Sequence, residues 1–201
     1  MEALATHLPD LAIAAALAWG AGLRLYLVTF VFGFAAWMGW WPLPEHLSVL
    51  SHPLVLGASG FMALVEGLAD KLPFLDSAWD AVHTFIRVPA GAALAAAAFG
   101  ADETAVMVAA GLLGGTLTAA THVSKAGTRV AVNASPEPVS NMLVSTAEDA
   151  AVLGGSWLAV THPGLFLGLL GVFLVLAALL MRVLVRGARR LAGGLRRRPG
   201  T

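Results

Sequence analysis

The sequence contains no cysteine and few charged residues, and each of these absences excludes classes of protein. Without cysteine there is no disulfide framework, no thiolate metal site and no thiol chemistry. Charged residues make up 12% of the 201 positions, against about 25% in a typical soluble domain. Apolar residues make up 58% and the mean hydropathy is +0.80. This composition is typical of an integral membrane protein.

Hydrophobic blocks follow one another along the chain, separated by short breaks. A helix needs about 20 residues to cross a hydrocarbon core of about 30 Å, and most blocks are near that length. The first block, of 31 residues, is either a tilted, kinked helix or two short halves that meet at Gly20–Gly22. We predict an all-α integral membrane protein with six transmembrane helices, or seven if the first block forms two. The blocks are Leu11–Trp41, Leu54–Ala69, Asp76–Gly100, Ala105–Val132, Val139–Val160 and Gly164–Val185.

The two ends of the sequence differ in basic residues. No lysine or arginine precedes the first apolar run, which argues against a cleaved signal peptide. The last 20 residues hold seven of the 12 lysines and arginines and no acid. Such a tail after an apolar helix is expected on the cytoplasmic side of a bacterial inner membrane. Because no aromatic residue lies among the arginines, we do not expect the tail to bind nucleic acid. We predict one multi-pass domain over 1–185 and a basic cytoplasmic tail over 186–201.

Two short motifs occur twice in the same order, which predicts an internal duplication. The sequence AGLR, ending at Arg24, is echoed by AGTR, ending at Arg129. The sequence LSHP, ending at Pro53, is echoed by VTHP, ending at Pro163, and a hydrophobic block follows each proline. Proline is tolerated in the first turn of a helix, so these motifs indicate helix starts. The repeats would cover about 11–70 and 105–185, joined by 71–104, and broken segments in paired repeats are typical of transporter sites.

Polar residues recur at helical spacing and form stripes on the hydrophobic blocks. In the third block Asp76, Asp80, His83 and Arg87 follow one helix face. A charged side chain at the bilayer centre costs roughly 2.5–3.5 kcal/mol on insertion scales, so the stripes must face one another or a water-filled cavity. The candidate site residues are Glu66, Asp80, His83, Arg87, His122, Lys125, Arg129, Asn133, Asn141, Glu148 and Asp149. Weaker candidates are Asp70, Lys71 and Asp76, which flank Pro73 in what reads as a turn near the membrane interface.

Three classes of function fit these stripes. The first is a transporter or channel that moves an ion or small solute through an acid-rich cavity, since intramembrane carboxylates are usual in such pathways. The second is an enzyme acting on lipid-linked phosphate, with Mg²⁺ or another cation at Asp76 and Asp80 and with phosphate held by Arg87, Lys125 and Arg129. The third is a scaffold in which ion pairs only hold helices together. We expect no other cofactor. The expected partners are the lipid bilayer and a small ion or solute, and the chain could also form a homo-oligomer.

The segment NASPEPVSN, residues 133–141, bears on this choice because its prolines break the helix between the fourth and fifth blocks. Irregular backbone at membrane depth is tolerated only against protein or water. If the segment is re-entrant, its peptide groups become ligands and transport is favoured. If it lies at the surface, it is only a connector.

Two longer stretches carry a resemblance to a known family. EGLADKLPFLDSAWDAVHTFIRVPAG, from Glu66, and the region from THVSKAGTRVAVN to STAED resemble the hallmark stretches of a bacterial integral-membrane family known only as domain of unknown function 4126. The resemblance covers about residues 11–185. One departure is Arg24, where the family tends to carry asparagine, so Arg24 is a weaker site candidate than Arg129. The resemblance implies a membrane fold and characteristic polar residues, and it implies no activity.

Overall fold

The computed structural model describes residues 2–72, 75–100, 104–133 and 138–196. Within these residues the chain forms six α-helices, one 3-10 helix and no strand, which confirms the predicted all-α class. The elements are α1 (Glu2–Trp37), η1 (Glu45–Ser51), α2 (Pro53–Ala69), α3 (Leu75–Ala97), α4 (Thr104–Asn133), α5 (Pro138–Thr161) and α6 (Pro163–Arg196).

The helices coincide with the predicted hydrophobic blocks. Both histidine–proline motifs begin a helix as predicted, with Pro53 opening α2 and Pro163 opening α6. At α2 the cap is the histidine itself, because His52 Nδ1 accepts a hydrogen bond from the Leu54 N–H at 3.2 Å. The element that the hydrophobic pattern did not predict is η1, which buries Leu47 and Leu50 between α1 and α2.

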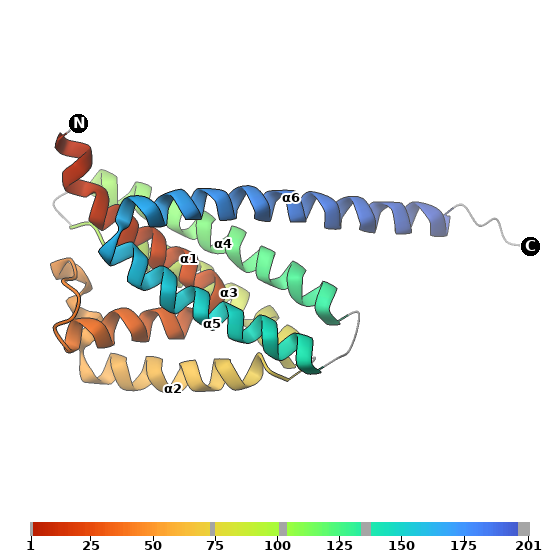
Figure 1. Cartoon of the computed structure of the whole chain (residues 1–201), viewed down its shortest axis with the longest axis horizontal. Coiled ribbons are helices and arrows are strands. Elements are labelled where there is room, and N and C mark those ends of the chain that lie inside the picture. Colours follow the sequence, from red (N-terminus) through yellow and green to blue (C-terminus); the bar gives the residue numbers. More distant parts are fainter. Residues whose placement is uncertain (1, 73–74, 101–103, 134–137, 197–201) are drawn as a thin grey trace, which may run out of the picture.

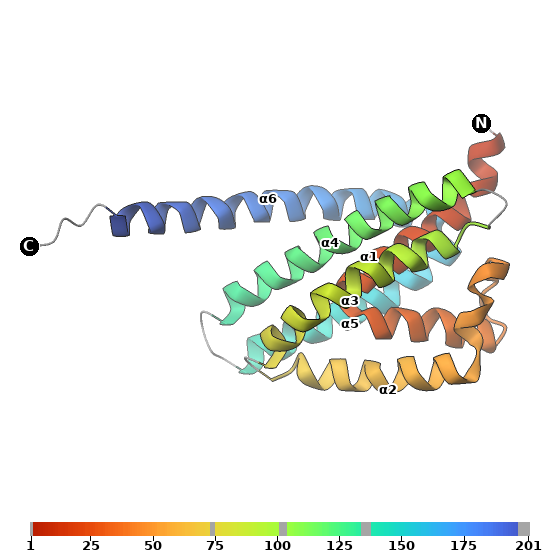
Figure 2. The ribbon, with the colours of Figure 1, turned by 180° about the vertical axis from the view of Figure 1, so that it is seen from behind.

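Helix α1 turns back on itself at Arg24. The backbone of Arg24 is non-helical, with φ −145° and ψ 79°. A Cβ placed on Gly20 would lie 2.6 Å from Val28 Cγ2, although residues eight apart in a straight helix are about 12 Å apart. Residues 25–37 therefore form a second arm that runs back toward the end where the N-terminus lies (Figures 1 and 2). Of the two forms expected for the first block, the structure has two halves, and they meet at Arg24 rather than at Gly20–Gly22.

By length and composition, fewer helices pass as membrane spans than the six or seven predicted. Among the described residues three qualify, in the segments His7–Trp37, Thr104–Val132 and Pro163–Gly187. The count rises to four if η1 and α2, which meet at a bend of 64°, form one broken span. Helices α3 and α5 have 23 and 24 residues, which is enough length, but they carry the polar stripes that lower their hydropathy.

The bundle is built around α1, which contacts every other helix. The N-terminus, η1 and the connection from α5 to α6 lie at one end, hereafter the N-terminal end (Figure 1). The end of α2, the start of α3, the end of α4 and the start of α5 lie at the opposite end, hereafter the tail end, beyond which α6 extends (Figures 1 and 2). The two ends of the described chain are therefore on opposite sides of the bundle.

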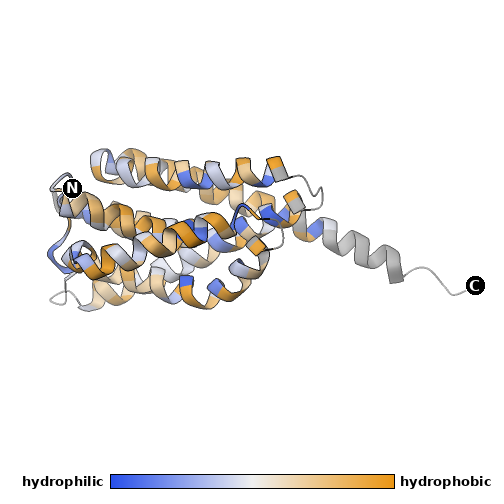
Figure 3. Ribbon diagram, turned by 90° about the horizontal axis from the view of Figure 1, so that it is seen from below, coloured by the Kyte–Doolittle hydropathy of each residue, from blue (hydrophilic) through white to orange (hydrophobic). Residues whose placement is uncertain are grey.

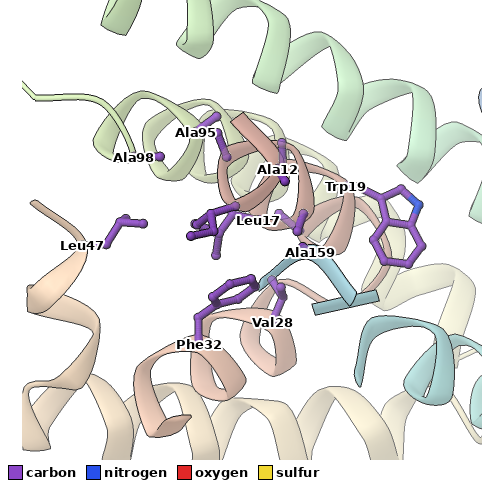
Figure 4. Close-up of a cluster of buried hydrophobic side chains, with 14 of the residues drawn as sticks. Ala12, Leu17, Trp19, Val28, Phe32, Leu47, Ala95, Ala98 and Ala159 are labelled. Carbon is purple, nitrogen blue, oxygen red and sulfur yellow. The ribbon is translucent and has the colours of Figure 1, made fainter. Parts of the chain in front are cut away.

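The apolar core occupies the N-terminal end. It gathers Leu17 and Trp19 from the first arm of α1, Val28 and Phe32 from the second arm, and Leu47 from η1 (Figure 4). Small residues, Ala95 in α3, Ala98 just after it and Ala159 in α5, let both helices approach α1 closely. Many large apolar side chains remain exposed, and Figure 3 shows hydrophobic positions along the helices of the bundle. Exposed apolar surface on this scale marks a membrane or protein contact.

The order of elements agrees with the duplication that the motifs predict. Arg24 stands at the turn of α1, and Arg129 stands in the last turns of α4, before the connection to α5. In each half a helical stretch follows the arginine, residues 25–37 in the first half and α5 in the second, before Pro53 opens α2 or Pro163 opens α6. Helix α3 belongs to the segment between the two proposed repeats. The duplication itself stays a prediction.

Candidate functional site

Nine charged side chains from five helices gather toward the tail end of the bundle, and we refer to them as the charge cluster. Eight of them are at most 9% exposed, and Asp149 is partly exposed. Each helix contributes from the stretch nearest the tail end or, in α1, from the turn. The members are Arg24 of α1, Glu66 at the end of α2 and Asp70 directly after it, Asp80 and Arg87 of α3, Lys125 and Arg129 of α4, and Glu148 and Asp149 of α5.

Asp70 contacts three cations, as Glu148 does. Its Oδ2 lies 2.6 Å from Lys125 Nζ, 2.9 Å from Arg24 Nη1 and 3.8 Å from Arg129 Nη2. Asp70 caps α2, where its backbone N–H donates to the Glu66 carbonyl at 3.0 Å, and its side chain is fully buried. Asp70 thus lies in a turn, as the sequence predicts, and its side chain points into the protein.

Arg24 connects the turn of α1 to α5. Its Nη2 donates to Ser145 Oγ at 2.6 Å and to the Ser145 carbonyl at 3.1 Å, and its Nε lies 3.0 Å from Asp149 Oδ1. Because the backbone leaves the helix at Arg24, the guanidinium reaches α2 and α5 at once. Arg24 is 1% exposed, as is Arg129, so the geometry gives no reason to rank it below Arg129.

Arg129 makes the corresponding connection from α4. Its Nη1 donates to Asn141 Oδ1 at 2.5 Å and to the Asp70 carbonyl at 3.2 Å. Its Nη2 lies 2.9 Å from Glu148 Oε2, which is also 3.5 Å from Lys125 Nζ. The two arginines of the repeated motif thus meet the same acids, Asp70 and Glu148, from opposite halves of the chain.

A second group of contacts surrounds Arg87. Its Nη2 lies 2.7 Å from Glu66 Oε1 and its Nη1 lies 2.8 Å from Asp80 Oδ1. Nη1 also donates to His122 Nδ1 at 3.1 Å, so this nitrogen carries no proton. His122 Nε2 is then the protonated nitrogen and donates to Thr84 Oγ1 at 2.7 Å. These contacts correspond to the tautomer of His122 that is protonated at Nε2.

Acids outnumber bases in the part of the cluster around Arg87. Among the described side chains, the group of Asp70, Glu148 and Asp149 faces the three cations Arg24, Lys125 and Arg129. Around Arg87, by contrast, Glu66 and Asp80 share one guanidinium, and the next cation is Lys125 Nζ, 3.5 Å from Asp80 Oδ1. Glu66 Oε2 and Asp80 Oδ2 are buried and accept no hydrogen bond from the described residues. The described cluster therefore has five carboxylates and four permanent cations.

Two pockets reach the cluster from either side of α5. One, of about 620 Å³, lies between α1, α2 and α5 and includes Arg24 and Asp149 in its lining. The other, of about 490 Å³, is lined by α1, α4, α5 and α6 and includes Lys125 and Glu148. The remaining lining of both pockets is mainly apolar. The neighbouring acids Glu148 and Asp149 are thus each accessible from a different side.

The structure does not bring every predicted residue into the cluster. His83 is buried but stacks on Trp79, with ring centroids 4.0 Å apart, and its Nδ1 lies 2.9 Å from the Trp79 carbonyl. Lys71 is exposed and lines the mouth of the larger pocket. Asn141 joins through Arg129. The side chains of Asp76 and Asn133, and residues 134–137 of the predicted break, lie outside the described part of the chain.

The sequence reasoning missed Thr84. Its hydroxyl donates to the Asp80 carbonyl at 2.8 Å and accepts from His122, so it holds the imidazole in place. Its position four residues after Asp80, on the same stripe, was the available signal.

The proposed cation site at Asp76 and Asp80 gains no support from the described contacts. Asp80 already faces two cations, Arg87 and Lys125. Among the described residues no group of three or more histidine, aspartate or glutamate side chains is arranged to hold a metal ion.

Comparison with known proteins places the chain in a family. A family model described as domain of unknown function (DUF4126) matches residues 11–183, which include every member of the charge cluster. No curated protein and no solved structure gives a significant match. The resemblance carried by the stretch from Glu66 and by the region around Arg129 is confirmed, and the chain belongs to the DUF4126 family, whose function is unknown.

Proposed function

We propose that this protein is a membrane transport protein that moves a proton or another small cation through the charge cluster. The observation that carries the proposal is the surplus acid around Arg87, where Glu66 and Asp80 share one guanidinium in a buried site. An uncompensated buried carboxylate is costly and is relieved by taking up a proton or a cation. The cluster is therefore suited to bind one positive charge and to release it.

Access to the cluster from two sides supports transport over a purely binding role. The two pockets approach α5 from opposite faces and include Asp149 and Glu148, respectively. Helix α5 is attached to α4 largely through Arg129, which contacts Asn141 and Glu148. A small displacement of α5 would exchange these ion pairs and open the cluster toward one pocket or the other.

The orientation we propose follows from the distribution of charge over the two ends. No lysine or arginine occurs in the described segments at the N-terminal end, whereas Lys71 and the arginines of α6 lie at or beyond the tail end. Positive residues favour the cytoplasmic side, so the tail end is cytoplasmic in a bacterial inner membrane. Trp37, Trp40 and Trp157 are exposed near the other end, where an aromatic belt would lie.

This orientation gives a specific topology. Helices α2 to α6 cross the membrane five times, and α1 enters from outside and returns at Arg24 as a re-entrant hairpin. The N-terminus is then outside and the C-terminus cytoplasmic. Reporter fusions at Met1 and after Thr201 test this: activity of a cytoplasm-specific reporter at Thr201 alone is expected, and activity at both ends would contradict the re-entrant α1.

Flux through the purified protein in sealed liposomes tests the function. A pH-sensitive dye and a panel of monovalent and divalent cation indicators should report cation or proton movement for the wild type. Glu66→Gln removes one acid of the surplus pair and should abolish flux without unfolding the protein. Glu45→Gln, at an exposed acid of η1, is the matched control and should transport normally.

A scaffold role is the second candidate, because each of the four cations in the cluster contacts at least one carboxylate. It makes the opposite prediction. If the cluster only holds helices together, no ion in the panel moves through the wild-type protein, and Glu66→Gln changes stability alone.

A further inference from the structure

The larger of the two pockets has a charged end and an apolar end. It has a volume of about 620 Å³ and lies beside α2. Arg24, Lys71 and Asp149 line the part nearest the tail end, and Phe30, Gly60 and Leu153 line the part nearest the N-terminal end. A pocket with this polarity has room and partners for an amphiphile.

The length and direction of the pocket match one leaflet of a bilayer. From Gly60 to Leu68 the pocket follows α2 for about 12 Å at 1.5 Å per residue. Lys71 extends it beyond the end of the helix, so the pocket covers close to half of a hydrocarbon core of about 30 Å. The charged end lies at the tail end, where the α2–α3 connection begins. An amphiphile in the pocket would therefore lie parallel to the lipids of that leaflet.

The charges at the polar end favour an anionic headgroup. Arg24 and Lys71 provide two positive charges, and Asp149 provides one negative charge. Asp149 Oδ1 lies 3.0 Å from Arg24 Nε, and the carboxylate is partly exposed. A phosphate group could therefore reach Lys71 at the rim and compete with Asp149 for the edge of the Arg24 guanidinium.

Small residues of α2 keep the pocket open. A Cβ on Gly67 would have no atom within 4 Å, whereas a Cβ on Gly60 would lie 3.0 Å from the Phe30 ring. The pocket is thus closed at Phe30 and open along Gly67. A larger side chain at Gly67 would start in open space at the wall of the pocket.

We propose that this pocket binds one anionic phospholipid, with its phosphate at Lys71 and Arg24 and an acyl chain directed toward Phe30. The site is distinct from the surplus acid pair and does not depend on ion transport. Because Arg24 and Asp149 belong to the charge cluster, a lipid bound here contacts the cluster directly.

The test is the shift in melting temperature of the detergent-purified full chain when lipid is titrated in, since a ligand that binds only the folded state stabilises it. Dioleoylphosphatidylglycerol should raise the melting temperature more than dioleoylphosphatidylcholine does. Gly67→Leu should lose this difference. Gly57→Leu is the matched control, because Gly57 is exposed on the same helix, lies outside the pocket and also has no atom near its Cβ.

Two further arms make the result decisive. Lys71→Gln should weaken the apparent affinity for phosphatidylglycerol about fivefold, which is the contribution of one basic residue near an anionic lipid. This variant tests the lipid site even if Gly67→Leu fails to fold. Inorganic phosphate should give no shift, which distinguishes a lipid from the free anion. The proposal is overturned if Gly67→Leu responds like the wild type, if Lys71→Gln keeps full affinity, if phosphatidylcholine acts equally or if phosphate alone reproduces the shift.

Discussion

The two ends of the bundle are held together in different ways. At the N-terminal end α3 and α4 touch through small residues: a Cβ on Gly115 would lie 3.2 Å from the Ala92 Cβ, and one on Gly114 would clash with Ala95. Close backbone approach through small residues is the usual basis of helix association in membranes. Among the described residues this end has no buried charged side chain.

At the tail end the helices are joined by long charged side chains instead. Arg24 reaches from α1 to α5, Arg129 from α4 to α5, and Lys125 from α4 to Asp70. Buried ion pairs are often no more stabilising than apolar packing of the same volume, and the other end shows that this chain can pack without them. The difference indicates that the buried charges at the tail end have a role other than stabilising the fold.

Among substitutions that test the difference between the two ends, Arg24→Met is expected to have the largest effect on the free energy of unfolding. The substitution keeps an unbranched side chain but leaves Asp70 and Asp149 without one of their cationic partners in a buried site. Removing one partner of a buried pair costs roughly 3–5 kcal/mol. We expect the free energy of unfolding in detergent to fall by that amount.

Arg182→Met is the control for this change, because Arg182 is an exposed arginine of α6. It should leave the free energy of unfolding nearly unchanged. Equal stability of the two variants would mean that the cluster is more hydrated than its burial indicates.

A smaller effect is expected at the N-terminal end from Gly91→Ala. The new Cβ would overlap Thr118 Oγ1 and lie 2.9 Å from Thr118 Cβ. Thr118 cannot easily move aside, because its hydroxyl bonds to the Ala18 carbonyl at 2.7 Å and the Gly114 carbonyl at 2.8 Å. Overpacking of this kind costs about 1–3 kcal/mol, which a chemical-unfolding curve would measure.

Gly111→Ala provides the matched control on the facing helix. Its Cβ would meet Ala96 Cβ at 3.5 Å, an ordinary contact. The control should therefore keep or slightly raise stability, since alanine favours the helix. If Gly91→Ala were as stable as Gly111→Ala, the two helices would have to be less closely packed than their small residues indicate.

The sequence predicts some of this arrangement because lipid imposes it. Hydrophobic length sets the helices, proline sets the starts of α2 and α6, and the cost of a charge in lipid turns Glu66, Arg87 and Arg129 inward. Each of these constraints acts on a residue or its near neighbours, so a pattern can reveal it.

What could not be predicted depends on contacts between distant segments. The turn at Arg24 is set by packing of the two arms of α1, of which AGLR gives only a hint. Asp70 and Lys71 look alike as residues after a helix, yet Asp70 is fully buried and Lys71 is exposed. Thr118 lies on the same stripe as His122 and Lys125 but packs against Gly91, away from the charges. Helical spacing shows which residues share a face of one helix, but not which residues of other helices they contact.

The smallest effect on stability is expected from Asp80→Asn, and it separates the surplus acid from the paired ones. Glu66 would still contact Arg87 at 2.7 Å, and the asparagine carbonyl could still accept from Nη1. The group of Glu66, Arg87 and residue 80 would then contain one acid and one base. The free energy of unfolding should therefore change by less than about 1 kcal/mol, in the range of a single net hydrogen bond.

Asp70→Asn is the counterpart, because it leaves three cations facing two acids, and it should lose roughly 3–5 kcal/mol. Unfolding curves of the two variants, measured side by side with liposome flux, decide whether the acids differ in role. Asp80→Asn should remain folded and lose flux, because the group that takes up the extra positive charge has been neutralised. If instead Asp80→Asn is destabilised as strongly as Asp70→Asn, Asp80 is a required partner of Arg87 and the cluster contains no surplus acid. If it remains both stable and active, the transported charge does not use Asp80, and Glu66 alone must accept it.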